Sequence, residues 1–210
     1  MTSSSAAKRI LDIAGASIGL VLISPILLAV GIAIAATMGR PVLFRQRRPG
    51  LDGQPFELVK FRTMLPTADP SRAQANDAGR LTPLGRFLRR TSLDELPELV
   101  NVLKGDMSLV GPRPLLMEYL DRYSPDQARR HDVRPGITGW AQVNGRNATT
   151  WDERFALDLW YVDNRSIGLD LRILGMTVRQ VLTRQGISAE GHATMPDFTG
   201  TVEPEPGEGD

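Results

Sequence analysis

The longest hydrophobic segment of the chain runs from Ile13 to Met38 and contains no charged residue. As a straight helix it would be roughly 39 Å long, which exceeds the roughly 30 Å hydrocarbon core of a bilayer. A helix that spans a membrane is therefore the first interpretation. Pro25, in the middle of the segment, favours a bent helix instead, because proline removes a backbone hydrogen bond and clashes with the preceding turn. The hydroxyl of Ser24 can satisfy the carbonyl group that Pro25 leaves free.

Basic residues flank this segment on both sides. Lys8 and Arg9 precede it, and four arginines follow it between positions 40 and 48. A spanning helix keeps its basic residues on the cytoplasmic flank, whereas a helix that enters and leaves through one leaflet places both ends at the anionic inner surface. Charge and proline therefore favour a re-entrant hairpin over residues 1–40, with a spanning helix as the open alternative. Ala33-Ile34-Ala35 resembles a signal-peptide cleavage site, but the segment is about twice the usual length and contains proline, so we expect it to be retained.

Beyond the hydrophobic segment, the pattern predicts short strands and helices. Residues 41–48 and 56–63 are predicted strands, joined by a turn at Gly50-Leu51-Asp52-Gly53. Apolar residues at helical spacing predict helix between Leu84 and Leu103, interrupted around Thr91-Ser92 and Pro97. This half of the chain should therefore hold a small β-hairpin followed by broken helices.

The C-terminal part contains two stronger helix signals. Thr150-Trp151-Asp152-Glu153 is a capping box that should open a helix reaching about Asn164, and a second helix is predicted from Leu169 to Gln185. Apolar residues line one face of that second helix, where core packing is favoured over contact with the bilayer. Residues 134–147, which hold three glycines and a proline, predict an irregular loop.

Composition narrows the chemistry. The 210 residues allow one domain with an appended segment, and no cysteine is present, which excludes thiolate metal sites and a cysteine nucleophile. His131 and His192 are the only histidines, so a bound metal would be held by oxygen, which favours Mg²⁺ or Ca²⁺. Residues 1–66 carry a net charge of +5 and residues 67–210 one of −4, so positive charge gathers around the hydrophobic segment, as is typical of a membrane surface.

Candidate catalytic residues concentrate between Arg86 and Arg113. Asp94 and Glu95 follow three nearby arginines, and Arg113 lies between two prolines. In isolation, two carboxylates in the first turn of a helix simply complement its dipole. Beside an arginine cluster, the same pair suggests Mg²⁺ ligation with a diphosphate held opposite, or a carboxylate that attacks phosphorus.

These residues belong to a series of motifs that resembles the catalytic domain of the bacterial sugar transferases, the monotopic phosphoglycosyl transferases. The matching motifs are, in order, Lys8-Arg9-Ile10-Leu11-Asp12, Ser24-Pro25, Phe44-Arg45-Gln46, Lys60-Phe61-Arg62-Thr63-Met64, Arg89-Arg90-Thr91-Ser92-Leu93-Asp94-Glu95-Leu96-Pro97-Glu98, Leu109-Val110-Gly111-Pro112-Arg113-Pro114, Pro135-Gly136-Ile137-Thr138-Gly139-Trp140, Tyr161-Val162-Asp163-Asn164 and Leu169-Asp170. Their order and spacing carry the specificity, because each motif alone would be weak.

The resemblance implies an activity. Such enzymes move a sugar phosphate from a UDP-sugar to a polyprenol phosphate such as undecaprenyl phosphate, releasing UMP, as the first membrane step of exopolysaccharide, O-antigen, capsule or glycoprotein assembly. By the same resemblance, Asp94 is the covalent nucleophile, Glu95 acts with Mg²⁺, Arg113 binds the diphosphate, and Ser24-Pro25 is the kink of the re-entrant helix. Further expected residues are the substrate-binding Lys60, Arg62, Arg86, Arg89 and Arg90 and the metal ligands Asp94 and Glu95.

The expected fold is mainly helical α+β. It combines a re-entrant membrane helix with a Ser-Pro kink (residues 1–40), a cytosolic catalytic domain with a small β-hairpin and interfacial amphipathic helices (41–190), and a disordered acidic tail (191–210). We expect a minimal, monotopic enzyme on the cytoplasmic face of the bacterial inner membrane. The sequence leaves the oligomeric state open, a homodimer included, and sugar specificity is expected in the 66–83 or 136–147 loop.

Two other functions compete with this one. A non-enzymatic membrane anchor that recruits a partner would explain the hydrophobic segment but not the Asp94-Glu95 pair or the arginine framed by prolines. A magnesium-dependent nuclease would need a basic groove, and the net charge of −4 over residues 67–210 disfavours it, so no nucleic-acid partner is expected.

Overall fold

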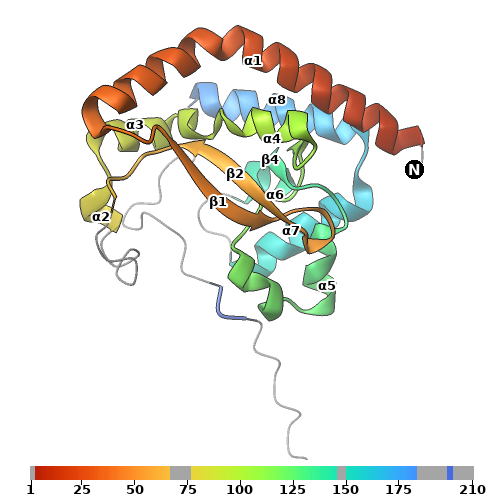
Figure 1. Ribbon diagram of the computed structural model, residues 1–210. Coiled ribbons are helices and arrows are strands. Elements are labelled where there is room, and N and C mark those ends of the chain that lie inside the picture. The colour runs from red at the N-terminus through yellow and green to blue at the C-terminus, as the bar shows by residue number, and fades with distance from the viewer. Residues whose placement is uncertain (1–2, 67–76, 146–149, 184–197, 201–210) are drawn as a thin grey trace, which may run out of the picture.

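Helix α1 (Ser3–Met38) arches over the rest of the chain in the computed structural model, which describes residues 3–66, 77–145, 150–183 and 198–200 (Figure 1). The helix continues through Pro25, which cannot donate to the carbonyl group of Val21 four residues earlier. The hydroxyl of Ser24 donates to that carbonyl at 2.8 Å, as the sequence predicted. Local compensation by Ser24 thus keeps α1 helical on both sides of the proline.

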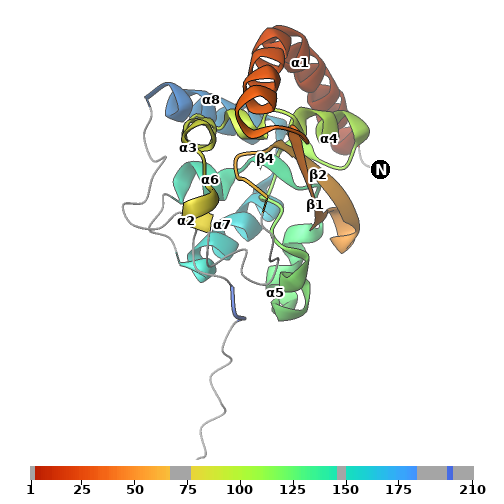
Figure 2. The same ribbon diagram turned by 60° about the vertical axis from the view of Figure 1, so that its left-hand side comes forward.

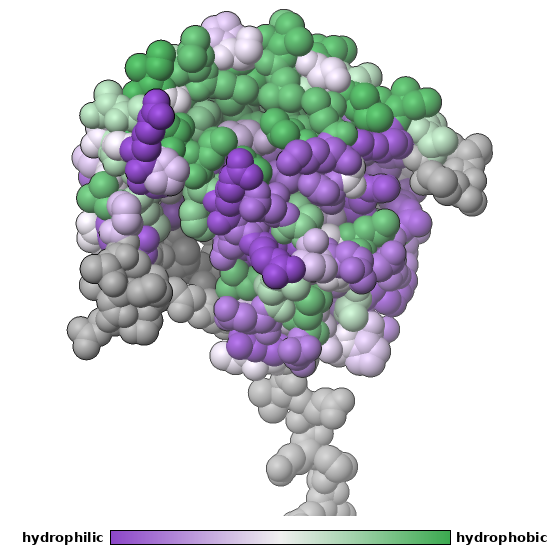
Figure 3. All heavy atoms as spheres, in the orientation of Figure 1, coloured by the Kyte–Doolittle hydropathy of each residue, from purple (hydrophilic) through white to green (hydrophobic). Residues whose placement is uncertain are grey.

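The outer surface of α1 is apolar and exposed. Val21, Leu22 and Leu28 are 73%, 72% and 67% exposed, and Figure 3 shows a continuous hydrophobic cover over α1 with hydrophilic residues beneath it. Within the described residues, Ala6–Met38 is long and apolar enough to cross a membrane, and only 11% of its most apolar stretch is buried. The core helix of a soluble protein would be mostly buried, so a membrane-associated helix explains α1 better.

Strands β1 (Leu43–Pro49) and β2 (Pro55–Phe61) form the antiparallel hairpin that the sequence predicted. The turn between them contains η1 (Leu51–Gly53), in which Asp52 and Gly53 both adopt positive φ angles. The inward residues Leu58 and Phe61 are buried, and they contribute to two different core clusters under α1. The hairpin therefore connects α1 to the segment that contains Asp94 and Glu95.

The segment after the hairpin is helical with the predicted interruptions. It contains α2 (Asp77–Arg80), α3 (Pro83–Arg90), the short 3-10 helix η3 (Leu93–Glu95) and α4 (Glu98–Lys104). Thr82 caps α3, and Gly85 is required there because a Cβ atom would lie 1.9 Å from the carbonyl oxygen of Thr63. Ser92 adopts the left-handed conformation with φ of 55°, which turns the chain sharply before Asp94.

The prediction of an irregular loop over residues 134–147 is wrong for its described part. Strand β4 (Gly136–Thr138) pairs in parallel with β3 (Ser108–Val110), and α6 (Trp140–Asn144) follows. The glycines serve close packing: a Cβ atom on Gly136 would lie 2.1 Å from the nitrogen of Gly111. Glycine composition suggested a loop, whereas long-range pairing with β3 decides the structure.

The remaining elements are helical. They are η4 (Met117–Arg122), α5 (Pro125–Ala128), η5 (Arg129–His131), α7 (Trp151–Asn164) and α8 (Ile167–Thr183). The capping box of Thr150 and Glu153 is present, so the predicted start of α7 is confirmed. The core-packing interpretation of the apolar face of α8 holds for Leu174, which packs beside Ile173. It is wrong for Leu171, Val178 and Val181, which are 54%, 58% and 45% exposed.

Among the described residues, four hydrophobic clusters hold these elements together. Figure 2 shows α3 and α4 beneath α1, α8 beside it, and α5 and α7 farther from it. One cluster was not expected: Phe198 is buried against Tyr119, Phe155 and Leu115. Apart from residues 198–200, the acidic tail predicted for 191–210 lies outside the described residues, as does the predicted helix stop at Gly186.

Candidate active site

Lys60, the residue before the last one of β2, lies between two carboxylates. Its Nζ atom is 3.0 Å from Oε1 of Glu95 and 3.0 Å from Oε1 of Glu98. All three side chains are largely withdrawn from solvent, with exposed fractions of 18%, 19% and 2%. The cluster therefore places one positive charge between two negative charges where solvent screens little.

Arg113 reaches the same carboxylate from the segment after β3. Both of its terminal nitrogens donate to Glu95, one to each carboxylate oxygen. Its carbonyl oxygen accepts from Arg130, which is itself buried and paired with Asp158 at 2.7 Å. Glu95 raises the pKa of Arg113 further above its ordinary value. The flanking prolines and the Arg130 contact thus hold a planar, permanently charged fork in one place.

Glu95 is ionised in this setting. Burial alone would raise the pKa of Glu95, but the charges and hydrogen bonds of Arg113 and Lys60 outweigh it and hold that pKa at about 2. The bidentate pairing with Arg113 occupies the donors that the sequence assigned to a diphosphate. A diphosphate ligand would therefore have to share or replace Glu95 as the partner of Arg113.

Asp94 lies beside this ionic cluster without joining it. Its side chain is 8% exposed, and none of the described residues donates a hydrogen bond to its carboxylate. Burial raises the pKa of Asp94, and the neighbouring charge of Glu95 raises it further, while Lys60, Arg113 and Arg89 oppose the shift. A carboxylate with few hydrogen bonds and a raised pKa is a better nucleophile than a fully solvated one.

Glu98 is a member of the cluster that the sequence analysis did not single out. It is 2% exposed, and burial raises its pKa to about 7 despite the opposing charge of Lys60. Its position at the start of α4, one helical turn after Asp94 and Glu95, was the available signal. The protonation state of Glu98, which is buried beside Lys60, therefore contributes to the net charge of the site.

Comparison with known proteins identifies the family. Residues 3–184 match the sequence profile described as bacterial sugar transferase. The chain belongs to this family. EpsL of Bacillus subtilis (strain 168), described as an uncharacterized sugar transferase, is 54% identical over 194 residues, which cover 92% of this chain and 96% of the relative. The resemblance stated from the sequence motifs is thereby confirmed.

Two other relatives of this sugar transferase have more specific names. A UDP-glucose:undecaprenyl-phosphate glucose-1-phosphate transferase of Caulobacter vibrioides is 45% identical over 186 residues, covering 84% of this chain and 70% of that protein. An Escherichia coli (strain K12) protein of the same name is 43% identical over 182 residues, covering 81% of this chain but 39% of the longer relative. The likeness thus extends over the whole described domain of this chain.

The other predicted binding residues of the sugar transferase lie at different distances from the cluster. Arg89 donates from Nε to the hydroxyl of Thr63 at 3.0 Å, and its charge acts on Asp94. Arg86 donates to the carbonyl oxygen of Leu81, and Arg90 is exposed on α3. The structure therefore brings Arg89 to the site, and none of the described contacts joins Arg86 or Arg90 to the cluster.

Arg62 is not brought to the cluster. Its guanidinium donates to the carbonyl oxygens of Met38 and Gly39, both at 2.5 Å, and to that of Arg40 at 3.4 Å. These carbonyl groups end α1, where backbone acceptors lack helical partners. Arg62 was predicted to bind substrate; the structure places its guanidinium at the C-terminal end of α1, and substrate binding by Arg62 stays a prediction.

The donor set at the site suits a metal ion that arrives with phosphate. Among the described residues, no group of three histidine, cysteine, aspartate or glutamate side chains is arranged to hold a metal. Asp94 and Glu95 offer two adjacent carboxylates, and Mg²⁺ commonly takes one or two carboxylates and completes its shell with water and substrate phosphates. The residues present fit that mode of Mg²⁺ binding and no closed protein cage.

Proposed function

We propose that this sugar transferase moves a sugar phosphate from a UDP-sugar to undecaprenyl phosphate, with Asp94 as the covalent nucleophile. The names of its relatives support the donor and acceptor classes. The observation that carries the mechanism is the buried, weakly hydrogen-bonded carboxylate of Asp94 next to Glu95, Lys60 and Arg113. The sugar itself is left general, because parts of both candidate specificity loops, residues 67–76 and 146–149, lie outside the described residues.

The reaction proceeds in two displacements at one phosphorus atom. A carboxylate oxygen of Asp94 attacks the phosphorus that bears the sugar, and the bond from that phosphorus to the bridging oxygen breaks, so UMP leaves with that oxygen. An oxygen of undecaprenyl phosphate then attacks the same phosphorus and frees the carboxylate, giving undecaprenyl-diphosphate-sugar. The acyl phosphate keeps enough transfer potential to pass the group onward, and ping-pong kinetics follow.

Charge neutralisation is the main requirement of the first displacement, since a carboxylate approaches a diphosphate. Arg113 and Lys60 lie where they can exchange Glu95 for phosphate oxygens, and Arg89 adds a third cation. Preorganised cations of this kind stabilise charge that develops in the transition state. Asp94 and Glu95 would hold Mg²⁺, which when bound supplies further neutralisation of the phosphate oxygens.

The re-entrant topology is part of the proposal, and the docking of both ends of α1 supports it. At the N-terminal end, Lys8 pairs with Asp170, and Asp12 accepts from Ser108. At the C-terminal end, Arg62 holds the last carbonyl groups. Because both ends bind the same domain, both are expected on the cytoplasmic side of the inner membrane, where the site meets the headgroup of the acceptor.

A donor-only assay tests the proposed function. We expect wild-type protein, mixed with UDP-sugar and Mg²⁺ but no acceptor, to release one UMP per active site in a burst. Asp94→Asn should give no burst, whereas the exposed control Asp121→Asn should behave as wild type. A burst from Asp94→Asn would refute the nucleophile, and no UMP from wild type with any UDP-sugar of a broad panel would favour the non-enzymatic anchor.

Cysteine labelling tests the topology, because the chain contains no cysteine. We expect Ala6→Cys and Arg40→Cys to resist a membrane-impermeant maleimide in spheroplasts and to react after permeabilisation. Both positions are exposed, so labelling reports the compartment rather than burial. Reaction at only one of the two ends in intact spheroplasts would show a helix that spans the membrane and would refute the re-entrant hairpin.

A further inference from the structure

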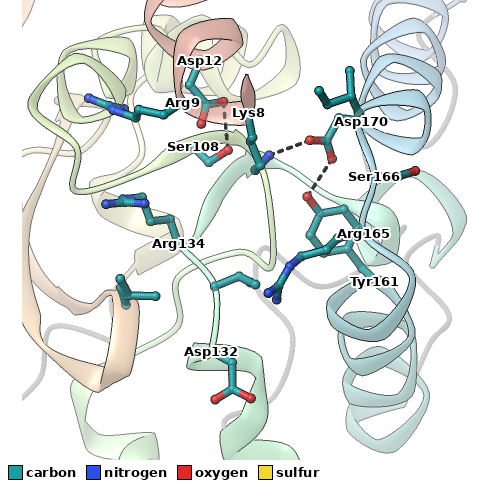
Figure 4. Close-up of a pocket in the computed structure, with 13 residues that line it drawn as sticks. Lys8, Arg9, Asp12, Ser108, Asp132, Arg134, Tyr161, Arg165, Ser166 and Asp170 are labelled. Carbon is teal, nitrogen blue, oxygen red and sulfur yellow. Dashed lines mark hydrogen bonds and ion pairs between the residues drawn. The ribbon is translucent and has the colours of Figure 1, made fainter. Parts of the chain in front are cut away.

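A polar cavity lies where the N-terminal end of α1 meets the corner between α7 and α8. Its volume is about 260 Å³, and Figure 4 shows side chains from α1, β3 and the α7–α8 corner converging on it. The described residues that line it include none of Asp94, Glu95, Arg113 and Lys60. The cavity is therefore separate from the proposed active site. Its lining contains the basic residues Lys8, Arg9, Arg134 and Arg165 and the acidic residues Asp12, Asp132 and Asp170.

The acidic groups deep in the cavity are already satisfied. Asp12, 2% exposed, accepts from the hydroxyl of Ser108 and from the backbone nitrogen of Leu109, both at 2.9 Å. Asp170, 1% exposed, accepts from Lys8 at 2.6 Å and from the hydroxyl of Tyr161 at 2.7 Å. These contacts fix the floor of the cavity and cancel the charge of Lys8 (Figure 4).

Arginines nearer the surface keep unused donors. Arg134 donates only from Nε, to the carbonyl oxygen of Gly105 at 2.8 Å, and within the described part of the chain its two terminal nitrogens have no hydrogen-bond partner. Arg165 is exposed, and no described residue forms a hydrogen bond with it. Asp132 is the one exposed acid among the lining residues. Both arginines line the cavity with donors that no described residue uses, and the oxygens of a phosphate ester match the guanidinium fork.

The place of the cavity in the fold indicates where that phosphate comes from. The cavity is bounded by Lys8 and Arg9, directly before the apolar stretch of α1, and by the first turn of α8. The outer face of α8 exposes Leu171, Val178 and Val181, and α8 lies beneath α1 in Figure 1 and beside it in Figure 2. If α1 enters the bilayer, the cavity is at the level of the lipid headgroups. This step rests on the membrane association of α1 and not on the catalytic mechanism.

We infer that this cavity binds the headgroup phosphate of an anionic phospholipid, with Arg134 and Arg165 as its ligands. The bound lipid holds the N-terminal end of α1 at a fixed depth. A soluble phosphate ester has the same binding chemistry, so the test separates the two sources.

The test measures binding of dihexanoyl phosphatidylglycerol, below its micellar concentration, to the full chain in non-ionic detergent by isothermal titration calorimetry. We expect one site, weakened about tenfold by Arg165→Glu, because charge-assisted hydrogen bonds contribute energies of that order. Arg47→Glu is the matched control: Arg47 is also an exposed arginine, lies outside the cavity lining and changes the net charge equally. It should weaken binding by less than twofold. Arg165→Gln provides a milder second variant if the charge reversal impairs folding.

Three outcomes would overturn the assignment. Equal losses in Arg165→Glu and Arg47→Glu would mean non-specific attraction to the protein surface. Equally tight binding of zwitterionic dihexanoyl phosphatidylcholine would mean that anionic charge is not recognised. If glycerol 3-phosphate binds as tightly as the lipid and loses affinity in the same variants, the site takes a soluble phosphate ester instead. UMP release in the donor-only assay reports the catalytic site separately, so failure here leaves the proposed function distinguishable.

Discussion

Replacement of Arg113 by alanine tests how the site handles negative charge. In the structure Arg113 donates to both carboxylate oxygens of Glu95, and its side chain is 31% exposed. In the proposed reaction the same fork turns to the diphosphate. Arg113→Ala therefore removes a bidentate cation that acts while charge develops, and leaves Lys60 as the remaining partner of Glu95.

The expected magnitude follows from the geometry. A hydrogen bond to a charged group contributes about 1.5–3 kcal/mol, and loss of one preorganised transition-state donor costs about 3 kcal/mol. Two donors that are partly exposed should together cost about 3–4 kcal/mol, or a loss of roughly 10²–10³ in kcat/KM. Arg113→Lys keeps the charge but not the planar fork, so we expect a smaller loss of about tenfold.

Initial rates of UMP release, measured with undecaprenyl phosphate at varied donor concentration, provide the assay. Arg45→Ala is the control, because Arg45 forms an ion pair with Glu57 in which both side chains are more than half exposed. Such pairs contribute at most about 1 kcal/mol to stability. A kcat/KM for Arg113→Ala within threefold of wild type, with the thermal midpoint unchanged, would refute the role assigned to the Arg113 guanidinium.

Three further predictions concern stability, each measured as the thermal unfolding midpoint in detergent. Burial raises the pKa of Glu98 to about 7, so the contribution of protonated Glu98 to stability is complete below about pH 4.5 and is lost as pH rises through 7. Glu98→Gln should therefore remove a difference in stability on the order of 3 kcal/mol between pH 5 and pH 8, and an unchanged pH profile would contradict this. Asp170→Asn leaves Lys8 without its buried partner and should lower the free energy of unfolding by about 3–5 kcal/mol. The exposed control Asp52→Asn should lower it by less than about 0.5 kcal/mol, and similar midpoints for both variants would argue against the anchoring of α1. Phe198→Ala empties a buried aromatic cluster and should cost about 3–5 kcal/mol; an unchanged midpoint would contradict the packing of Phe198 in that cluster.

Local patterns predicted the elements that depend on local signals. Turn residues predicted the β1–β2 hairpin, and the capping box of Thr150 predicted the start of α7. The chain breaks at Ser92 and Pro97 likewise follow from the chemistry of those residues themselves. The same holds for Ser24, whose hydroxyl reaches the carbonyl group that Pro25 leaves free. Such interactions span at most one helical turn, so a single sequence carries them.

Features that depend on distant contacts were not predictable in this way. Strand β4 exists because Gly111 and Gly136 let two backbones approach closely, which composition alone presents as a loop. Arg62 shares a motif with Lys60, yet Lys60 donates to Glu95, whereas Arg62, which follows the end of β2 at Phe61, donates to the end of α1. Glu98 belongs to the site because the fold buries it beside Lys60, a residue of a different element, and no local pattern shows that contact.

The most direct test of the account is to find where the sugar phosphate is attached. Protein incubated with a UDP-sugar and Mg²⁺, quenched in acid and digested, should yield by mass spectrometry a peptide that carries the sugar phosphate on Asp94. Addition of undecaprenyl phosphate before the quench should remove that adduct. An adduct on another residue, or acceptor-dependent turnover at full rate with no adduct on any residue, would contradict a mechanism that passes through the Asp94 carboxylate.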